Sequence, residues 1–556
     1  MESVSSRRMR KTGEVPSRSS TFAPFKHQNF RALWIATLVS NLGALVQGVG
    51  AGWMMTTITD SNSMVALVQA ATTLPIMVFS LASGALADNF DRRRLMLLAQ
   101  TGMMLVSVAL AVCAYLGLIT PWMLLGFTFL LGCGTALHNP PWQASMGDIV
   151  PREDLPAAVT LNSMGFNLMR SVGPAIGGII VAAAGVAAAF LVNAVSYITL
   201  IWALWRWQPA YPKSQLPREK VVSAMSAGLR YVSMSPNLLT VMLRAFVFGV
   251  TAVSALALLP LVASSLLSGG ALTYGGLLGA FGIGALIGGA VNGRVRERLS
   301  NEWIVRLSCL VFGLSNILLA YSSSTWLSLL LLLPAGAAWV MALSLFNVTV
   351  QLSTPRWVVG RALALYQTAT FGGLAVGSWL WGAVADGSGP RAAFLASGIA
   401  LIASIAIGLR LRLPAFSSLN LDPADRFTEP ELRLDLRARS GPIMIMIDYT
   451  IEQADVPAFL AAMTERRRIR IRDGARQWAL LRDLENPETW TESYHVPTWV
   501  EYIRHNHHLT QADIEVTENL RGLHKGSARP RVHRMIERQT VPQGDDMPLK
   551  ENPQVP

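Results

Sequence analysis

The sequence predicts an all-α membrane protein with twelve transmembrane helices in two six-helix pseudo-repeats, followed by a small cytoplasmic α+β domain. The first observation behind this prediction is composition. Of 556 residues, 52% are hydrophobic and 14% are charged, whereas about 25% of the residues of a soluble domain are charged. The second is distribution, because charges are sparse between residues 31 and 412 and abundant on either side. The third is an internal repeat within that apolar region.

Twelve apolar runs are long enough to cross a bilayer. A hydrocarbon core about 30 Å thick requires about 20 residues of helix at a rise of about 1.5 Å per residue. Because no water reaches the backbone there, each run must be helical. The predicted spans are residues 31–56, 63–87, 95–117, 121–146, 157–183, 187–206, 238–264, 273–293, 303–321, 325–350, 361–385 and 390–411.

These runs and the polar segments around them divide the chain into six parts. Residues 1–28 are rich in Ser and Arg and lack an apolar core, which predicts a disordered cytoplasmic tail and not a cleaved signal. The other predicted parts are an N-terminal six-helix bundle at 29–206, a cytoplasmic linker at 207–236, a C-terminal six-helix bundle at 237–413, a soluble domain at 414–540 and a disordered tail at 541–556.

Lys and Arg are concentrated in alternate loops, and this asymmetry predicts the orientation of the chain. Cytoplasmic loops of membrane proteins carry an excess of basic residues. One set of loops contains most of them, among them Arg92 to Arg94, Arg152 and Arg361, whereas the opposite set contains only Arg391. Both termini should therefore lie in the cytoplasm. The net charge of +12 then reflects membrane orientation, and no nucleic acid partner is expected.

Two stretches of the first bundle recur in the second. Aligning "GALADNFDRRRL" with "GAVNGRVRERLS" pairs Gly84 with Gly289, a displacement of 289 − 84 = 205 residues. Aligning "RSVGPAIGG" with "LAVGSWLWG" pairs Gly173 with Gly377, a displacement of 377 − 173 = 204 residues. One large class of secondary transporters is built from such parallel repeats.

The loop after the second span resembles the loop motif of the major facilitator superfamily of transporters. That motif reads Gly, three residues, Asp, Arg, any residue, Gly and two basic residues. Asn89 and Asp91 replace its Arg and its second Gly, and in the second half Gly293 stands where the acid should be. The residues that match the motif in the first half are Gly84, Asp88, Arg92 and Arg93.

The resemblance implies that Asp88 takes part in a gate. Its carboxylate would lie against the amino end of the eleventh helix, near Gly360 and Arg361, where the helix dipole favours an anion. Such a contact would close the inner side in one conformation only, with Arg92 and Arg93 orienting the acid or completing a charge network. Ordinary solvation of a helix end is the alternative.

The fifth span contains a second motif, "GPAIGG", which resembles the antiporter motif of exporters in this superfamily, although Met169 replaces the preceding glycine. Tight helix packing is the alternative role for these small residues. The strings "FLVNAVSYI" and "GRALALYQTATFGG" resemble the exporter branch that includes enterobactin and macrolide efflux proteins. This resemblance covers about residues 25–412 and implies export across a bacterial-type inner (plasma) membrane. The residues of the antiporter-type motif are Gly173, Pro174, Gly177 and Gly178.

Polar residues inside the spans are candidates for a central cavity. Arg170 lies near the middle of the fifth span, where a guanidinium costs about 2.5–3.5 kcal/mol on insertion scales. It should face the cavity or a polar contact between helices, and a fixed bond to neighbouring carbonyls is the alternative. Arg244 is nearer a helix end and should extend to the membrane surface. The candidate cavity residues are Asn41, Gln47, His138, Asn139, Arg170, Asn347 and Gln367, and each could instead join two helices.

The coupling ion and other partners are constrained mainly by what the spans lack. None of the predicted spans has an Asp or Glu near its middle, so a proton as coupling ion is implied by the family resemblance alone. His138 is the only titratable group at depth that could carry a proton, but a lone histidine more often has a structural role. Asp60 and Asp386, near the outer ends of spans, are the other candidates. The chain has no GxxxxGK[ST] string, so ATP is not an expected partner. Its three cysteines lack metal spacing, and no metal or cofactor is expected.

The soluble domain reads as a ferredoxin-like alternation of strands and helices. "PIMIMIDYT", "RQWALLRDL", "WTESYHV" and "RVHRMI" have the composition of strands, and the apolar spacing that begins at Val456 predicts a helix. Further helices are expected near 498–507 and 511–522. The region resembles the antibiotic-biosynthesis-monooxygenase-like module appended to some transporters of this branch. His505, His507 and His508 lack a ligand partner and should form a solvated helix end.

These features predict a secondary active transporter, and not an enzyme. It would export a small amphipathic molecule, siderophore or drug-like, by alternating access between its two halves, with the lipid bilayer as its surroundings. A membrane-anchored sensor or regulatory protein that acts through its C-terminal domain is the alternative. A third reading is a fused enzyme that acts on a delivered substrate.

Overall fold

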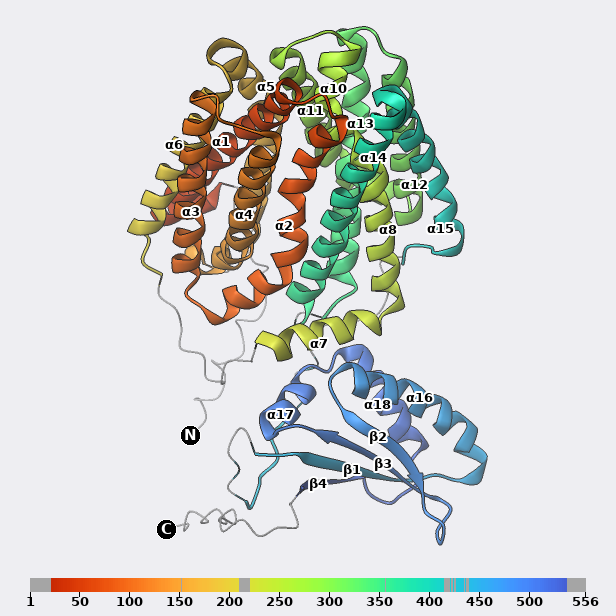
Figure 1. Cartoon of the computed structure of the whole chain (residues 1–556). Coiled ribbons are helices and arrows are strands. Elements are labelled where there is room, and N and C mark those ends of the chain that lie inside the picture. Colours follow the sequence, from red (N-terminus) through yellow and green to blue (C-terminus); the bar gives the residue numbers. More distant parts are fainter. Residues whose placement is uncertain are drawn as a thin grey trace, which may run out of the picture. The chain divides into compact units, whose positions relative to one another are not determined.

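The computed structural model describes residues 22–151, 153–209, 221–355, 357–414, 421, 424, 427–434, 436 and 440–537. Figure 1 labels their helices and strands. These residues form two compact units. The first contains the described parts of Met1–Val221, Leu243–Leu345 and Gln367–Arg412, and the second those of Val222–Met242, Phe346–Tyr366 and Leu413–Pro556. Of the predicted tails, residues 1–21 and 541–556 lie outside the described residues.

Long helices make up the first unit. The amino-terminal helices are α1 (Gln28–Ile58), α2 (Asn62–Asn89), α3 (Arg92–Tyr115), α4 (Pro121–Ile149), α5 (Leu155–Ala184) and α6 (Val186–Arg206). Later helices are α8 (Pro236–Ala252), α9 (Ser254–Ala257), α10 (Leu259–Leu261), α11 (Ala271–Arg298), α12 (Asn301–Tyr321), α13 (Thr325–Leu352), α14 (Val359–Ala403) and α15 (Ile407–Arg410). Residues of α8, α13 and α14 belong to both units.

Short polar side chains begin several of these helices. Ser61, Thr120 and Ser300 each accept a hydrogen bond from the backbone N–H three residues later, at the first turn of α2, α4 and α12. Such caps satisfy N–H groups that have no partner inside the helix. Asp91 caps α3 in the same way by accepting from Arg94 N. The residue that departs from the loop motif therefore has a structural role of its own.

Eleven helices among the described residues are long and apolar enough to cross a membrane. The last of them, Val359–Arg410, has 52 residues. One span requires about 20 residues, so this segment is more than twice as long as needed. Inside it, Gly389 has φ 84° and ψ 160°, which is not a helical conformation. Gly185, which separates α5 from α6, has φ 81° and ψ 172°. The two interruptions are 389 − 185 = 204 residues apart.

The starts of two helix pairs repeat with the same displacement, whereas the starts of α2 and α11 and of α3 and α12 are 271 − 62 = 301 − 92 = 209 residues apart. The starts of α4 and α13, Pro121 and Thr325, are 325 − 121 = 204 residues apart. The starts of α5 and α14, Leu155 and Val359, are 359 − 155 = 204 residues apart. The internal repeat that two short sequence matches indicated therefore extends to the helical architecture.

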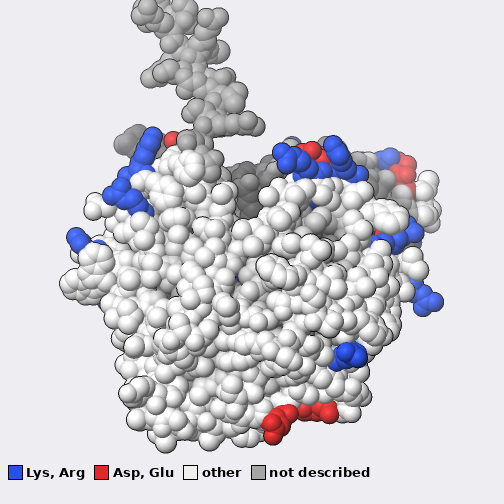
Figure 2. All heavy atoms as spheres, turned by 90° about the horizontal axis from the view of Figure 1, so that it is seen from above, with Lys and Arg blue, Asp and Glu red and all other residues white. Residues whose placement is uncertain are grey.

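Charge is sparse on the helical part of the chain. Figure 2 shows a face in which uncharged residues form one broad surface, with Lys, Arg, Asp and Glu near its margin. Many large apolar side chains of the helices are exposed, such as Leu105, Ile198 and Leu330. A soluble protein would have to bury such an extended apolar surface, whereas a lipid-facing one need not.

A four-stranded antiparallel sheet forms the core of the C-terminal domain. Its strands are β1 (Ile443–Thr450), β2 (Arg476–Arg482), β3 (Thr489–Val496) and β4 (Arg531–Ile536), in the order β2-β3-β1-β4. Its helices are α16 (Val456–Arg472), α17 (Trp499–His507) and α18 (Gln511–Leu523). Alternate residues of β1 are buried and pack with Phe459 and Met463 of α16. The strands and helices that the sequence predicted are all present in the predicted order.

The linker contains a helix that the sequence analysis missed. α7 (Val221–Ser233) lies inside the predicted linker at 207–236. Gly228, Tyr231 and Val232 are buried, while Leu229 is exposed, so α7 has one packed face. A sequence signal was available, because Met225, Leu229 and Val232 have the i, i+4, i+7 apolar spacing of a helix.

Candidate transport cavity and gate contacts

A cavity of about 300 Å³ lies inside the first unit. Its wall contains residues of α1, α2, α4 and α6 from the first repeat and of α9, α10, α11 and α14 from the second. None of the described residues that line it is charged. The lining residues are Ala44, Gln47, Gly48, Ala51, Gly52, Val65, Val68, Gln69, Thr72, Thr73, Ile76, Thr128, Leu131, Gly132, Thr135, Asn193, Tyr197, Leu256, Ala257, Pro260, Tyr274 and Phe371.

A buried amide network forms one wall of this cavity. Gln47 Oε1 accepts hydrogen bonds from Ser107 Oγ, at 2.7 Å, and from Asn193 Nδ2. Asn193 Nδ2 also lies 3.1 Å from Ser107 Oγ and 3.2 Å from the Tyr197 hydroxyl. These bonds join α1, α3 and α6. Polar groups held in this way stay hydrogen-bonded inside an apolar bundle and present a fixed polar surface to the cavity.

Only some of the polar residues that were predicted to face a central cavity line this one. Gln47 lines it, and Gln69, which has the same amide group, lines it from α2. Asn193 and Tyr197 were missed, although their spacing of four residues within "FLVNAVSYI" places both on one helix face.

The other amide and histidine candidates lie elsewhere. Asn41 and Gln367 are half-buried, and Asn139 is exposed. His138 is buried, and its ring stacks on Trp142 at a centroid distance of 6.4 Å. Asn347 belongs to the second unit and accepts a hydrogen bond from Gln351 Nε2 at 2.5 Å. A substrate-contacting role for these residues stays a prediction.

Arg170 lies where α5 meets α11. Its guanidinium carbon is 5.9 Å from the ring centroids of both Phe281 and Trp339. Aromatic faces attract a cation, and this attraction is larger where water is excluded. The charge in the middle of α5 is thus met by an aromatic cluster of the second repeat.

The antiporter-type motif lies in the closest approach of α5 and α11. A Cβ atom added to Gly178 would lie 2.9 Å from the Ala271 carbonyl oxygen, and one added to Gly275 would lie 2.6 Å from the Pro174 carbonyl oxygen. Real Cβ contacts are essentially never so short. Only glycine allows the two backbones to touch here.

The other motif glycines face α1. A Cβ atom on Gly173 would lie 2.9 Å from Leu45 Cβ, and one on Gly177 would lie 3.0 Å from Val46 Cα. α5 therefore has one glycine surface toward its own repeat and another toward the second repeat.

The arginines of the loop motif bind helix ends of the first repeat. Arg92 Nη1 donates to Asp148 Oδ2 at 2.8 Å and to the Ala144 carbonyl at 3.0 Å, both on α4. Arg93 donates to the carbonyls of Leu204 and Trp205 on α6, at 2.8 and 2.6 Å. These bonds fix the start of α3 against α4 and α6. Asp88 is in the last turn of α2, but its side chain and its predicted contact lie outside the described residues.

The second repeat has a related arrangement. Arg296, in the last turn of α11, donates from Nη2 to the Ser344 carbonyl of α13 at 3.3 Å. Asn292, one turn earlier, donates from Nδ2 to Ser344 Oγ at 3.0 Å. These bonds fix the end of α11 against α13, whereas Arg92 and Arg93 fix the start of α3.

α2 and α14 meet through polar contacts. Asp386 accepts hydrogen bonds from Ser61 Oγ and from Ser63 N, both at 3.2 Å, at the amino end of α2. A carboxylate is favourable there because the helix dipole is positive at that end. Further along α2, Ser80 Oγ lies 3.0 Å from Thr368 Oγ1 of α14.

Arg244 is bound at the ends of two other helices, and its predicted extension to the membrane surface stays a prediction. Its side chain is buried and pairs with Glu302 at 2.5 Å. Glu302 also accepts a hydrogen bond from Arg306 at 2.9 Å. An acid at the start of α12 compensates the buried charge, and this partner is distant in sequence from Arg244.

Comparisons with known proteins agree with this geometry. The uncharacterized MFS-type transporter YfiS of Bacillus subtilis is 27% identical over 342 residues, which cover 59% of this chain and 80% of YfiS. The enterobactin exporter EntS of Escherichia coli O1:K1 is 28% identical over 385 residues, which cover 68% of this chain and 90% of EntS.

Solved structures share the fold at low sequence identity. An inward-facing bacterial homolog of the human lysosomal transporter Spinster gives a TM-score of 0.56 at 14% identity, over 71% of this chain and 97% of that one. A POT family transporter in complex with 5-aminolevulinic acid gives 0.57 at 13% identity, over 69% and 96%. The family model described as transmembrane secretion effector matches residues 19–541. The chain therefore belongs to the transmembrane secretion effector family of major-facilitator transporters.

Proposed function

We propose that the protein exports a small amphipathic molecule, siderophore or drug-like, across the inner membrane by alternating access. The observation that carries this proposal is the uncharged cavity whose wall combines helices of both repeats. Its lining joins amide and hydroxyl groups to aliphatic and aromatic ones, which suits a ligand with both polar and apolar parts. The similarity to the enterobactin exporter supports the outward direction.

The membrane part has twelve spans in this proposal, with both termini in the cytoplasm. Gly389 divides the 52-residue segment at the position equivalent to Gly185, and each part is then long enough to cross the bilayer. The basic residues concentrated in alternate loops support the orientation.

Two interfaces between the repeats would open and close. α5 touches α11 through Gly178 and Gly275, and α2 touches α14 through Ser80, Thr368 and Asp386. Interfaces made of small residues and a few hydrogen bonds can separate without leaving large buried charges unpaired. Arg170, among the aromatic rings beside α11, would change its surroundings when the α5–α11 interface opens.

Asp88 would close the inner side against the start of α14, near Gly360 and Arg361. Arg92 supports this role because its ion pair with Asp148 fixes the loop that follows α2. The proton is proposed as coupling ion on the family resemblance. The described cavity lining contains no carboxylate, so a coupling proton would be carried outside it.

The strand order β2-β3-β1-β4 supports a ferredoxin-like C-terminal domain within 414–540. The family and the similar proteins are transporters, so the alternative of a sensor without transport is not favoured. Neither ATP nor nucleic acid is proposed as a partner.

Uptake of labelled enterobactin into inverted membrane vesicles tests the transport proposal. Gln47→Leu removes the central acceptor of the amide network and should lower uptake about tenfold or more, a loss of about 1.4 kcal/mol per factor of ten. Gln143→Leu is the matched control, because Gln143 is an exposed residue of α4 with the same amide group and does not line the cavity. Equal uptake by both variants and the unchanged protein would count against the cavity.

Asp88→Asn tests the gate in the same vesicles, with Asp91→Asn as a neighbouring control that keeps the cap of α3. We expect loss of uptake for the first and little change for the second. Collapsing the proton gradient tests coupling separately, and an unchanged uptake rate would remove the proton from the proposal.

A further inference from the structure

The C-terminal domain contacts α7 and the segment before α14 through a ladder of four side chains. The ladder runs from Arg472 to Tyr231, Trp357 and His508. The Arg472 guanidinium carbon is 5.2 Å from the Tyr231 ring centroid. The Tyr231 ring meets Trp357 edge-to-face, at 5.7 Å and 86°. Trp357 stacks on His508, with centroids 3.9 Å apart and planes 3° from parallel. All four residues belong to the second compact unit.

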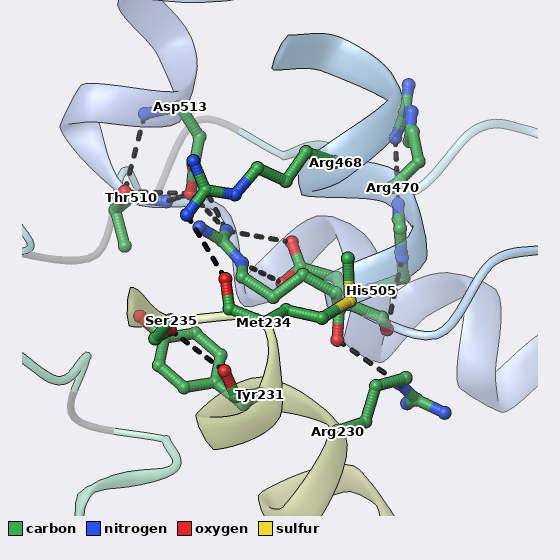
Figure 3. Close-up of polar contacts among 11 residues, drawn as sticks. Arg230, Tyr231, Met234, Ser235, Arg468, Arg470, His505, Thr510 and Asp513 are labelled. Carbon is green, nitrogen blue, oxygen red and sulfur yellow. Dashed lines mark hydrogen bonds and ion pairs between the residues drawn. The ribbon is translucent and has the colours of Figure 1, made fainter. Parts of the chain in front are cut away.

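Hydrogen bonds reinforce this ladder. Arg468 Nη2 donates to the Met234 carbonyl at 3.1 Å, and Arg230 Nε donates to the Arg472 carbonyl at 3.2 Å. Figure 3 shows Arg468 of α16 reaching Met234 at the end of α7 while Arg230 reaches back toward α16. The two bonds run in opposite directions across the contact, so α7 and α16 each donate and accept.

The ladder end on α16 is held rigidly. Arg472 is bound by Asp473, at 2.9 Å, and by Asp513 of α18, at 3.0 Å. Asp513 in turn accepts hydrogen bonds from Thr510 N and Oγ1 in a capping box. A guanidinium fixed on two carboxylates is preorganised for contact with the Tyr231 ring, because little further side-chain freedom is lost.

The expectation of a solvated helix end at His505, His507 and His508 was wrong for two of the three. His505 is 2% exposed and bonds Arg470 Nη1 at 2.8 Å. Burial, with Arg361 nearby, lowers the pKa of His508 to about 3, so this ring is neutral in the cytoplasmic pH range. The stack on Trp357 is therefore one of neutral rings and should not depend on pH near neutrality.

The contact extends to the first turn of α14. A Cβ atom on Gly228 of α7 would lie 2.7 Å from Arg361 Cβ, so α7 packs directly on this turn. Trp357 precedes α14 by two residues, and α7 precedes α8 by two residues. The C-terminal domain thus touches the segments that lead into two long helices of the second repeat.

We propose that the C-terminal domain is a built-in brace that docks on α7 and Trp357 and restrains the start of α14. This inference rests on the proposed function for one step, that the start of α14 is the surface on which the inner gate closes. Docking holds Arg361 and the first turn of α14 in one place. Release of the domain frees that turn, so α14 separates from α2 more often.

Two readouts on the full-length protein in lipid nanodiscs test the brace. Hydrogen exchange of α7 and of residues 353–361 reports docking. The rate of disulfide formation between Ser80→Cys and Thr368→Cys, with the native cysteines replaced, reports contact of α2 with α14. Ser80 and Thr368 suit this purpose because their hydroxyl oxygens are 3.0 Å apart. Neither readout requires a known substrate.

Trp357→Ala, His508→Ala and the double variant form a cycle around the stack. An aromatic pair changes an equilibrium by about three- to tenfold, so each single variant should raise exchange by about that factor. Exchange in the double variant should be only slightly faster than in either single variant, because all three variants lose the same contact. The disulfide should form about threefold more slowly in all three. His507→Ala is the control, since His507 is exposed and one residue from the stack.

The possible outcomes separate docking of the domain, restraint of α14 and the proposed transport function. Unchanged exchange in the Trp357 and His508 variants would show that the domain does not dock through the ladder. Raised exchange with an unchanged disulfide rate would show docking without restraint of α14, which also overturns the inference. A protein that fails to transport enterobactin but gives both expected results would count against the proposed function and leave the brace intact.

Discussion

Glu492 is a charged residue in the middle of the C-terminal sheet, and its side chain is fully buried. Arg470 Nε lies 3.2 Å and Arg466 Nε 3.5 Å from its carboxylate, and Trp478 Nε1 donates to it at 3.1 Å. These partners lower the pKa of Glu492 although burial alone would raise it. The domain core thus depends on one acid that balances two buried arginines.

Glu492→Gln should destabilise the C-terminal domain by about 3–5 kcal/mol, because it leaves buried guanidinium charges uncompensated. Hydrogen exchange of β1 and β3 amides in the full-length protein would measure this loss. Glu488→Gln is the control, since Glu488 is exposed in the turn before β3. A loss equal to that of the control would mean that the arginines find other partners.

Asp473 makes the stability of this domain depend on pH. Burial raises its pKa from 3.8 to about 6, against the opposing effect of Arg472. Between these values the folded chain holds a proton that the unfolded chain has lost, so this residue lowers stability as pH rises from about 4 to about 6. Asp473→Asn should flatten that slope in urea unfolding of the domain. An unchanged slope would assign it to another group.

At the scale of elements, glycine decides where helices meet and where they end. α5 and α11 touch because Gly178 and Gly275 have no side chain, and α14 is interrupted where Gly389 has a positive φ. The contact of α5 with α11 requires glycine because no side chain fits between the backbones. The interruption of α14 requires glycine because of its backbone conformation, so the two positions are tested separately.

Gly275→Ala should push α5 and α11 apart, because its Cβ atom would meet the Pro174 carbonyl at 2.6 Å. Overpacking of this kind costs about 1–3 kcal/mol, and transport should fall with it. Gly276→Ala is the neighbouring control, since its Cβ atom would meet only Leu329, at 3.9 Å. Thermal unfolding of the two variants should therefore differ, and so should their uptake in the vesicle assay of the proposed function. Similar results for both would show that the contact yields easily.

Gly389→Ala should cost about 1–2 kcal/mol, because an L-residue with a side chain is strained at φ 84°. Gly387 lies two residues away in helical conformation, and a Cβ atom added to it would meet no other atom. Gly387→Ala is therefore the control and should be neutral or slightly stabilising. Thermal unfolding of the two variants compares them directly. A neutral Gly389→Ala would mean that the helix can continue through this point.

At the scale of the whole molecule, the number of spans determines on which side of the membrane each loop lies. The internal repeat, the number of spans and the orientation can therefore be tested together. If Gly389 separates two spans, the residues around it form a loop on the side opposite the C-terminal domain. If α14 were one continuous span, the two sites would not be separated in this way. The turn between β2 and β3 provides a marker of the domain side, because Leu484 is 98% exposed.

Gly387→Cys and Leu484→Cys, each in a background without Cys113, Cys133 and Cys309, should label on opposite sides of the membrane. An impermeant thiol reagent added to intact cells should reach the first. It should reach the second only after permeabilisation. Labelling of both sites from one side would contradict twelve spans with cytoplasmic termini.

Much of the fold could be predicted from the sequence because its signals are local. Apolar runs of about 20 residues, basic loops and the alternation in "IMIMIDY" are each read within a few residues of chain. The cavity lining was harder to predict from the sequence. Gln47 was identified as a polar residue in the middle of a span, but Asn193 and Tyr197 were not identified as lining residues. A polar residue in a helix does not reveal which neighbouring helix it faces. The partner of Arg244 was not predicted, because Glu302 lies on another helix.

By itself, the sequence determined the class of protein, the internal repeat and the order of strands and helices in the C-terminal domain. Hydropathy and periodicity are properties of neighbouring residues, and no tertiary contact is required to read them. Only the tertiary structure decided that Gln47, Ser107 and Asn193 share one network. It also decided that Trp357 stacks on His508. These contacts join residues far apart along the chain, and packing alone selects which of many compatible polar and aromatic side chains meet.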